Sequence, residues 1–163
     1  MIQNSFIRFV AKIYQWIISV FSNLQSVFLF ILRITWGHQL FLAGYGKFQN
    51  LSRVGDAFAD LGIPLSHFNA SLVAGFELVG GLLLIFGFAS RLISIPLTVI
   101  MMVAYSTAHS HVFTGFQFIF DPSLIAKEAP FAFLMTTLIV LIFGPGRISI
   151  DAYIKRKIEE KKV

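Results

Sequence analysis

The chain has 163 residues, of which 56% are hydrophobic and only 13% charged, and its formal net charge is +5. Soluble domains usually contain about 25% charged residues, so a mean hydropathy of +0.79 favours a membrane protein over a soluble enzyme. The absence of cysteine excludes disulfides, thiol redox chemistry, iron–sulfur clusters and thiolate metal sites. We expect lipid rather than nucleic acid as the partner of this chain, because its cations are placed around apolar segments.

Residues 1–26 predict an amphipathic helix that lies in the membrane interface. Its polar residues recur at helical spacings of four and three on one stripe, at Arg8, Lys12, Gln15, Ser19, Ser22 and Ser26. Apolar side chains cover the rest, and the two cations would meet anionic head groups. The alternative is a fifth spanning helix, which would bury both cations at high cost. No signal-peptide pattern is present at the start of the chain, so we expect no removable signal peptide.

Four later segments are apolar enough to cross a bilayer, for which a helix needs about 20 residues. They are residues Val27–Gly46, Asn69–Phe88, Leu92–Val112 and Pro130–Phe143, of which the last is short unless it begins nearer Leu124. The sequence therefore predicts an all-α integral membrane four-helix bundle in residues 27–154. The interfacial helix precedes this domain, and a charged cytoplasmic tail, residues 155–163, follows it.

The loops predict the orientation and two further short helices. Most lysines and arginines lie on one side if both ends are cytoplasmic, and only Lys47, Arg53 and Lys127 lie outside. Between the first two spans, a short helix should follow Ser52 and end at Gly62. After the last span, a structural turn at residues 144–147 should lead into a terminal helix that starts near residues 149–151.

Three segments carry a family resemblance. They read LRITWGHQLFLAGYGKF (Leu32–Phe48), FELVGGLLLIFGFASRL (Phe76–Leu92) and GPGRISIDAYI (Gly144–Ile154). In this order and spacing they resemble the DoxX family of bacterial four-helix membrane proteins. The resemblance implies a multi-pass protein of the bacterial inner membrane. It also implies a link to terminal quinol oxidase, to thiosulfate:quinone oxidoreductase and to redox or oxidative-stress functions.

Charged residues and glycines share one face of the first predicted span and one face of the second, at Arg33, Gly37, Gly44, Lys47, Glu77, Gly80 and Gly87. Glycines allow close helix approach, so these faces should meet inside the bundle. Arg33 and Glu77 would differ in depth by about 9 Å, which a long side chain or a water could close. We expect a structural ion pair or hydrogen bond between them. A proton-relay or quinone-contact role for Glu77 is the alternative.

A second polar group is predicted in the outer half of the bundle. His38, Tyr105 and His109, together with Thr136 and Thr137, could line one outward-facing cavity with Glu77. Imidazoles and hydroxyls near a carboxylate could bind the carbonyl oxygens of a quinone or transfer protons to it. The predicted ligand site is therefore Arg33, His38, Lys47, Glu77, Tyr105 and His109.

Two alternatives remain for the histidines of this group. His109 and His111 could simply sit at the water interface. A zinc or iron site from His38, His109 and Glu77 is conceivable, although the spacing is not that of a recognised metal motif, and we predict no metal.

These features predict a membrane subunit that binds a quinone or quinol, or an accessory partner of a redox complex that does. The chain shows no resident redox centre, so electrons would come from a partner protein. One alternative is a non-catalytic scaffold that recruits proteins through its interfacial helix and loops. A third hypothesis is a small transporter, although the sequence shows no inverted repeat or interrupted helix pair. A homo-oligomer is compatible with each.

Overall fold

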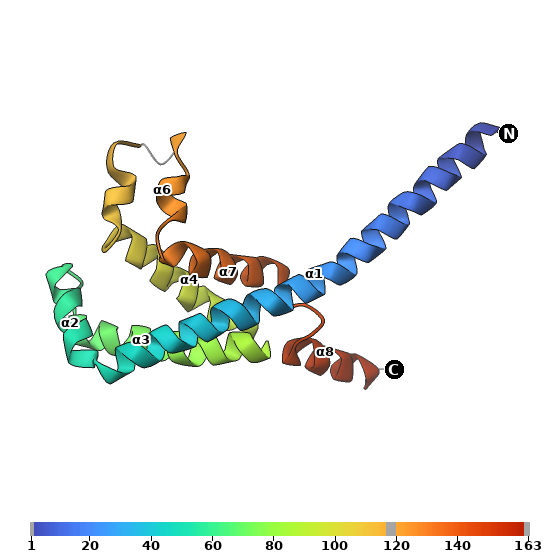
Figure 1. Cartoon of the computed structure of the whole chain (residues 1–163). Coiled ribbons are helices and arrows are strands. Elements are labelled where there is room, and N and C mark those ends of the chain that lie inside the picture. Colours follow the sequence, from blue (N-terminus) through green and yellow to red (C-terminus); the bar gives the residue numbers. More distant parts are fainter. Residues whose placement is uncertain (1, 117–119, 162–163) are drawn as a thin grey trace.

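The computed structural model describes residues 2–116 and 120–161, and this part of the chain is helical without any strand (Figure 1). The side chains of residues 7–113 and 120–161 are described. The elements are α1 (Ile2–Gln49), α2 (Leu51–Asp60), α3 (Ser66–Phe86), α4 (Ser90–Ser106), the 3-10 helix η1 (Ser110–Phe116), α6 (Ser123–Ala126), α7 (Pro130–Phe143) and α8 (Ile150–Glu160). The all-α prediction is confirmed.

Helix α1 is a single uninterrupted helix of 48 residues, about 72 Å long at a rise of about 1.5 Å per residue. The sequence predicted a separate helix over residues 1–26, but the structure has no break at that boundary. The physical reason is that residues 2–36 contain neither glycine nor proline, so nothing interrupts the helix. Residues 7–25 are exposed and extend beyond the other helices (Figure 1). Their placement in a membrane interface stays a prediction.

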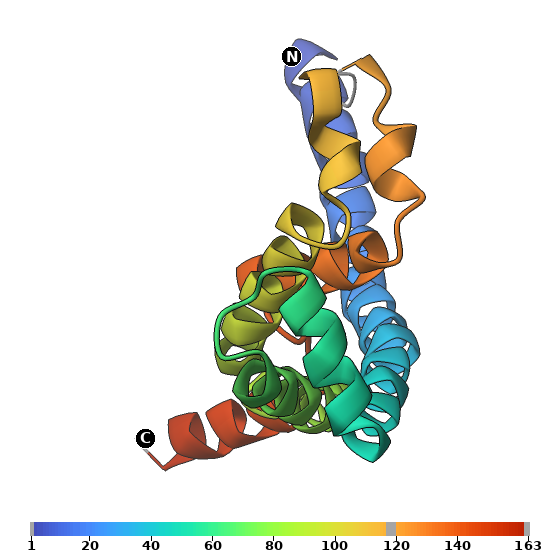
Figure 2. The same ribbon diagram turned by 90° about the vertical axis from the view of Figure 1, so that its left-hand side faces the viewer.

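Two closely packed helix pairs form the core of the molecule. The second half of α1 packs along α3, and α4 packs along α7 (Figures 1 and 2). Glycines set the α1–α3 distance: a Cβ added to Gly81 would lie 2.6 Å from the carbonyl oxygen of Gly37. The glycines of α1 do lie close to α3 as predicted, but the prediction is wrong for Gly80, where an added Cβ would meet Leu97 and Ile93 of α4. The pairs meet over Leu40, Leu84, Leu97 and Val140, all of which are fully buried.

One end of the bundle, which we call the sealed end, is closed by backbone turns. Helix α3 ends at Gly87, whose φ of 67° is suited to a residue without a Cβ. The carboxylate of Asp151 accepts hydrogen bonds from the amides of Ala89 (2.8 Å) and Ser90 (3.0 Å) at the start of α4. A negative charge is favourable at a helix N-terminus. The opposite end, which carries α2, η1 and α6, is called the open end.

The observed helices agree in part with the predicted spans. Helices α1 and α3 are long and apolar enough to cross a membrane by length and composition, whereas α4 and α7 are shorter apolar helices. Helix α4 ends at Ser106, before the predicted limit of Val112, because the chain continues there as η1. Helix α7 starts at Pro130, which suits a first helical turn, so α6 does not extend it.

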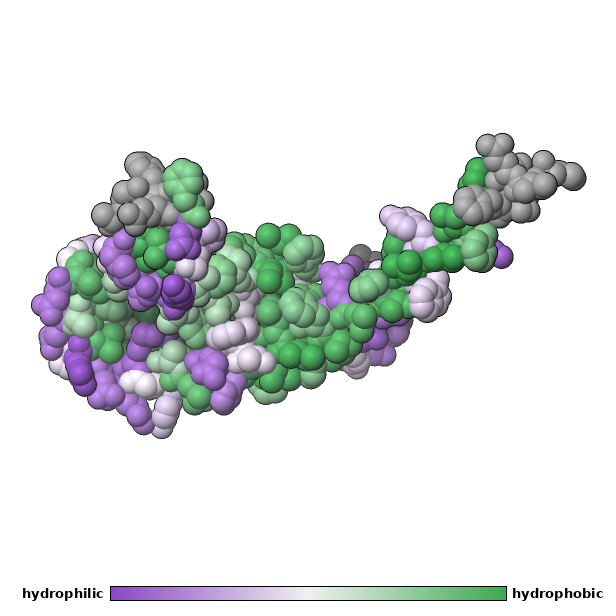
Figure 3. Space-filling view, turned by 45° about the horizontal axis from the view of Figure 1, so that its top comes forward, coloured by the Kyte–Doolittle hydropathy of each residue, from purple (hydrophilic) through white to green (hydrophobic). Residues whose placement is uncertain are grey.

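The hydropathy of the surface changes between the middle of the bundle and its open end. In Figure 3, apolar side chains cover the middle of the bundle, while hydrophilic side chains gather at the open end.

At the sealed end, the Arg147 guanidinium donates to the side-chain oxygen of Asn23 on α1 (3.1 Å). The start of α8 therefore lies beside the middle of α1, and α8 then runs outward to the side of the bundle (Figure 2).

Candidate functional site

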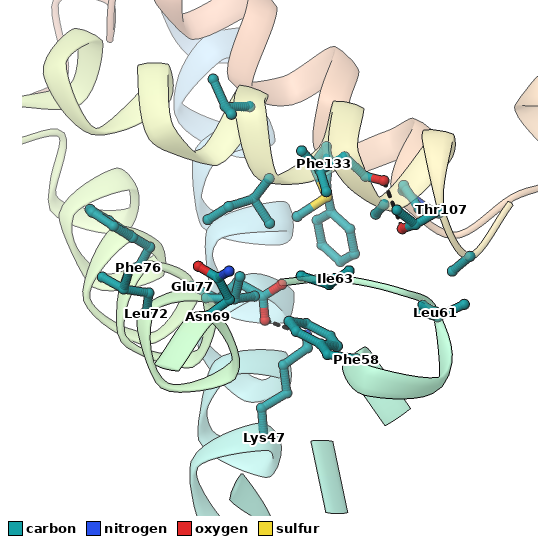
Figure 4. Close-up of a pocket in the computed structure, with 18 of the residues that line it drawn as sticks. Lys47, Phe58, Leu61, Ile63, Asn69, Leu72, Phe76, Glu77, Thr107 and Phe133 are labelled. Carbon is teal, nitrogen blue, oxygen red and sulfur yellow. Dashed lines mark hydrogen bonds and ion pairs between the residues drawn. The ribbon is translucent and has the colours of Figure 1, made fainter. Parts of the chain in front are cut away.

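A cavity of about 840 Å³ lies at the open end, between α1, α2, α3, α4 and the start of α7. Its lining is mostly apolar, with side chains such as Phe58, Phe76 and Phe133 around it (Figure 4). A few polar side chains also line it: Lys47, Asn69, Glu77, Thr107 and His109. An apolar pocket with a small number of placed polar groups is typical of a site for an organic ligand.

Part of the pocket wall is formed by α3 and α4 and reaches the outer surface of the bundle. These helices are joined by a tight turn at the sealed end, and the pocket separates them toward the open end. Leu72 and Phe76 of α3 and Val99 and Val103 of α4 line the pocket and are also exposed on the outer surface of the bundle. An apolar molecule could therefore enter sideways, between the two helices, without passing the polar open end.

The pocket contains one ion pair between α1 and α3. Lys47 Nζ donates to Glu77 Oε2, and the side chain of Glu77 is 4% exposed against 30% for Lys47. Gly44, one turn before Lys47, makes this pairing possible. A Cβ at that position would lie 2.3 Å from the amide nitrogen of Leu78, so only glycine lets the two helices approach this closely.

On the α4 side, the rim of the pocket holds a cluster of aromatic and ionisable groups. The ring of Tyr105 lies 6.1 Å from that of His109, and its hydroxyl donates to the carbonyl oxygen of Ile125 (2.8 Å). His109 Nδ1 lies 2.6 Å from Glu128 Oε2, and His111 Nε2 lies 3.2 Å from Glu128 Oε1. The carboxylate of Glu128 thus joins two imidazoles at the edge of the site.

Arg33 does not line the cavity, and the predicted contact between Arg33 and Glu77 is wrong. Arg33 is fully buried at the sealed end, where Nη1 donates to the Leu84 carbonyl oxygen (3.1 Å) and Nη2 to that of Ile148. Gly37 lies against Gly81 in the antiparallel α1–α3 pair, so Arg33 is level with the end of α3. Carbonyl groups at a helix C-terminus carry partial negative charge and therefore take the guanidinium.

Other predicted members of the site are also separated. His38 is exposed on α1 and does not line the cavity, because it follows Gly37, which faces α3. Thr136 and Thr137 are buried in the helix core, where Thr98 bonds Thr137 (3.0 Å between hydroxyl oxygens). Within residues 2–116 and 120–161, no group of three or more His, Asp or Glu side chains could hold a metal ion.

Of the predicted ligand residues, Lys47, Glu77 and His109 line one cavity. Tyr105 does not line it, but its ring lies next to that of His109. The sequence reasoning missed Asn69, Thr107 and Glu128. One signal for Glu128 was available, since it is one of two acidic residues in the aromatic loop between α4 and α7, which follows two histidines.

Comparison with known proteins assigns the family. A family model described as DoxX matches residues 28–110, just over half of the chain, including Lys47, Glu77 and His109. The chain belongs to the DoxX family. The resemblance seen in the sequence is thereby confirmed, and the chain is a DoxX-like membrane protein.

Two relatives of this DoxX protein are similar over most of their length. The "Putative oxidoreductase CatD" of Bacillus subtilis (strain 168) is 25% identical over 124 residues, which cover 76% of this chain and 84% of the relative. A protein of Haemophilus influenzae named "Uncharacterized protein" is 28% identical over 136 residues, which cover 81% of this chain and 86% of the relative. No solved structure matches the chain significantly.

Proposed function

We propose that this DoxX protein crosses the bacterial inner membrane four times, through the second half of α1 and through α3, α4 and α7. Both ends of the chain are then cytoplasmic, and the open end faces outward. The contact between Arg147 and Asn23 supports this topology, because it holds the end of the fourth span beside the start of the first. The cations also support it, since most of them fall on the sealed side.

The pocket at the open end binds a quinone or quinol in this proposal. The observation that carries it is the combination of exposed apolar side chains of α3 and α4 in the pocket wall with polar groups inside the pocket. A lipid-soluble ring could enter from the outer half of the bilayer. Lys47 and Glu77 would then bind one oxygen of the ring, and His109 would bind the other.

Electrons for such a ligand come from a partner redox protein in this proposal, because the chain has no cysteine to hold a cluster. The printed name of the Bacillus relative, a putative oxidoreductase, is compatible with such a role. The chain would act as the quinone-binding membrane subunit or accessory partner of that complex.

A thermal-stability measurement tests the proposal. A short-chain quinone analogue should raise the unfolding temperature of the purified protein, since a ligand that binds only the folded state stabilises it. Glu77→Gln should abolish most of this shift, because it removes the charge that holds Lys47 at the pocket. The exposed Glu159→Gln in α8 is the control and should keep the full shift. A wild-type protein that shows no shift at saturating analogue would contradict the proposal.

A second function, a scaffold that recruits proteins, is favoured by one observation. Every side chain of residues 7–25 of α1 is exposed, including Phe9, Trp16 and Phe21. A scaffold should co-purify with a partner that is lost when residues 4–23 are deleted, and it should show no stability shift with the analogue.

A further inference from the structure

The cluster around Glu128 leads from the pocket to water. His109 lines the pocket and has a side chain that is 25% exposed, Glu128 is 23% exposed, and His111 is 68% exposed. The contact between His109 Nδ1 and Glu128 Oε2 is 2.6 Å long, and the hydrogen bond between His111 Nε2 and Glu128 Oε1 is 3.2 Å long. Three ionisable side chains thus form a continuous chain from the cavity wall to the solvated surface of the loop.

The geometry also orients His109. Its Nδ1 is turned toward Glu128, which leaves Nε2 as the ring nitrogen for a ligand in the cavity. Two other ionisable groups lie around these three side chains. The Tyr105 hydroxyl donates a hydrogen bond to the Ile125 carbonyl oxygen, and Lys127 precedes Glu128 in the sequence. Across the cavity, Lys47 and Glu77 are paired with each other.

We infer that His109, Glu128 and His111 carry protons between the pocket and the outer aqueous phase. This inference rests on the proposed quinone site. Reduction of a quinone to a quinol takes two electrons and two protons. The electrons come from the partner redox protein, and the protons must come from water, which an apolar pocket in a bilayer otherwise excludes.

Each proton moves by the same sequence of transfers, and between the two the His109 ring turns over so that a protonated nitrogen faces the cavity again. His109 Nε2 gives a proton to the reduced quinone oxygen while Nδ1 takes one from the protonated carboxyl group of Glu128. His111 then reprotonates Glu128 and is itself reprotonated by water. Oxidation of a quinol runs the same steps in reverse and releases two protons to the outer phase. Glu128 acts through His109 and is therefore a positioning and relay residue.

A single-turnover experiment tests the relay. The full chain, in lipid nanodiscs with a short-chain quinone analogue bound, is reduced with methyl viologen radical cation, a one-electron donor that releases no protons, and proton uptake is followed with a pH-sensitive dye in weak buffer. Glu128→Gln should slow proton uptake about a hundredfold, as is common when a general acid–base group is removed. The analogue should still raise its unfolding temperature, because the amide oxygen of Gln can still contact Nδ1 of His109. Glu128→Asp should restore much of the rate, together with the solvent deuterium isotope effect of the wild type.

The control is Asp121→Asn, an exposed acid of the same loop that has no contact with the two histidines and should keep the wild-type rate. Normal analogue binding with a wild-type rate of proton uptake in Glu128→Gln would overturn the relay and leave the quinone site standing. Absence of the thermal shift in the wild type would overturn both.

Discussion

Arg33 and Lys47 are two cations on the same face of α1, and the structure treats them differently. Arg33 is enclosed at the sealed end and is bound by backbone carbonyl groups of α3 and of the segment before α8. Lys47 is partly exposed, faces a cavity and pairs with a carboxylate. The difference teaches that a buried charge bonded to carbonyls in close packing stabilises the fold, whereas a buried pair beside an apolar cavity marks a ligand site.

The largest effect should come from Arg33→Met. This change removes charge-assisted hydrogen bonds to two carbonyl groups, so it should lower the free energy of unfolding by about 3 kcal/mol. Reversible unfolding in mixed detergent micelles measures the loss. The control is Arg91→Met, which removes an exposed cation bonded to Ile142 and should cost less than about 1 kcal/mol. Equal losses in both variants would mean that the burial of Arg33 does not stabilise the fold.

Two glycines of α1 near Lys47 should respond differently to replacement by alanine. Gly44→Ala would place a Cβ 2.3 Å from the amide nitrogen of Leu78, so α1 and α3 must move apart, at a cost of about 2 kcal/mol. Gly46→Ala, two residues later, meets nothing within 4 Å and should stabilise the helix by about 0.5 kcal/mol. The same unfolding assay compares them. Similar values for both would mean that the helices do not pack through Gly44.

The pocket wall can be tested with two matched leucines of α3. Leu72 (39% exposed) lines the pocket, and Leu82 (38% exposed) does not. Leu72→Trp should obstruct the pocket and weaken binding of the quinone analogue about tenfold, which is about 1.4 kcal/mol. Leu82→Trp should bind as the wild type does. Titration of the thermal shift against analogue concentration gives both affinities, and equal affinities would place the ligand elsewhere.

The smallest effect concerns a hydrogen-bonded carboxylate outside the helix bundle. Hydrogen bonds from Ser123 hold the pKa of the Asp121 carboxyl below its usual range. Because the folded-state pKa is lowered, the contact is present above the usual carboxyl pKa and is lost as the pH falls through the lowered value. The amide resonance of Ser123 should therefore shift only in strongly acidic solution, and in Asp121→Asn it should not titrate. A titration near neutral pH would contradict this assignment.

Much of the fold could be predicted from hydropathy and from helix signals. Ser149 was expected near the start of the last helix, and its hydroxyl accepts from the amide of Ala152, as a helix N-cap does. The glycine face of α1 followed from spacing, because a period of 3.6 residues fixes which side chains share a face; on α3, Gly81 rather than the predicted Gly80 meets α1.

The site could be predicted only in part, for a physical reason. Helical spacing shows that Arg33 and Glu77 face inward, but it does not show which groups lie opposite them. Arg33 binds backbone carbonyl groups, which every residue carries and which leave no mark in the sequence. The exposure of His38 and the link from His109 to Glu128 likewise depend on how the helices and the loop pack.

The role of Asp151 has a consequence for how the protein is made. The amides that begin α4 and the guanidinium of Arg33 obtain partners from residues 148–151, close to the end of the chain. During synthesis, α1, α3 and α4 are therefore complete before these partners exist. The contacts can form only after residues 148–151 have left the ribosome, and nascent chains that stop before Ile148 should be degraded as unfinished.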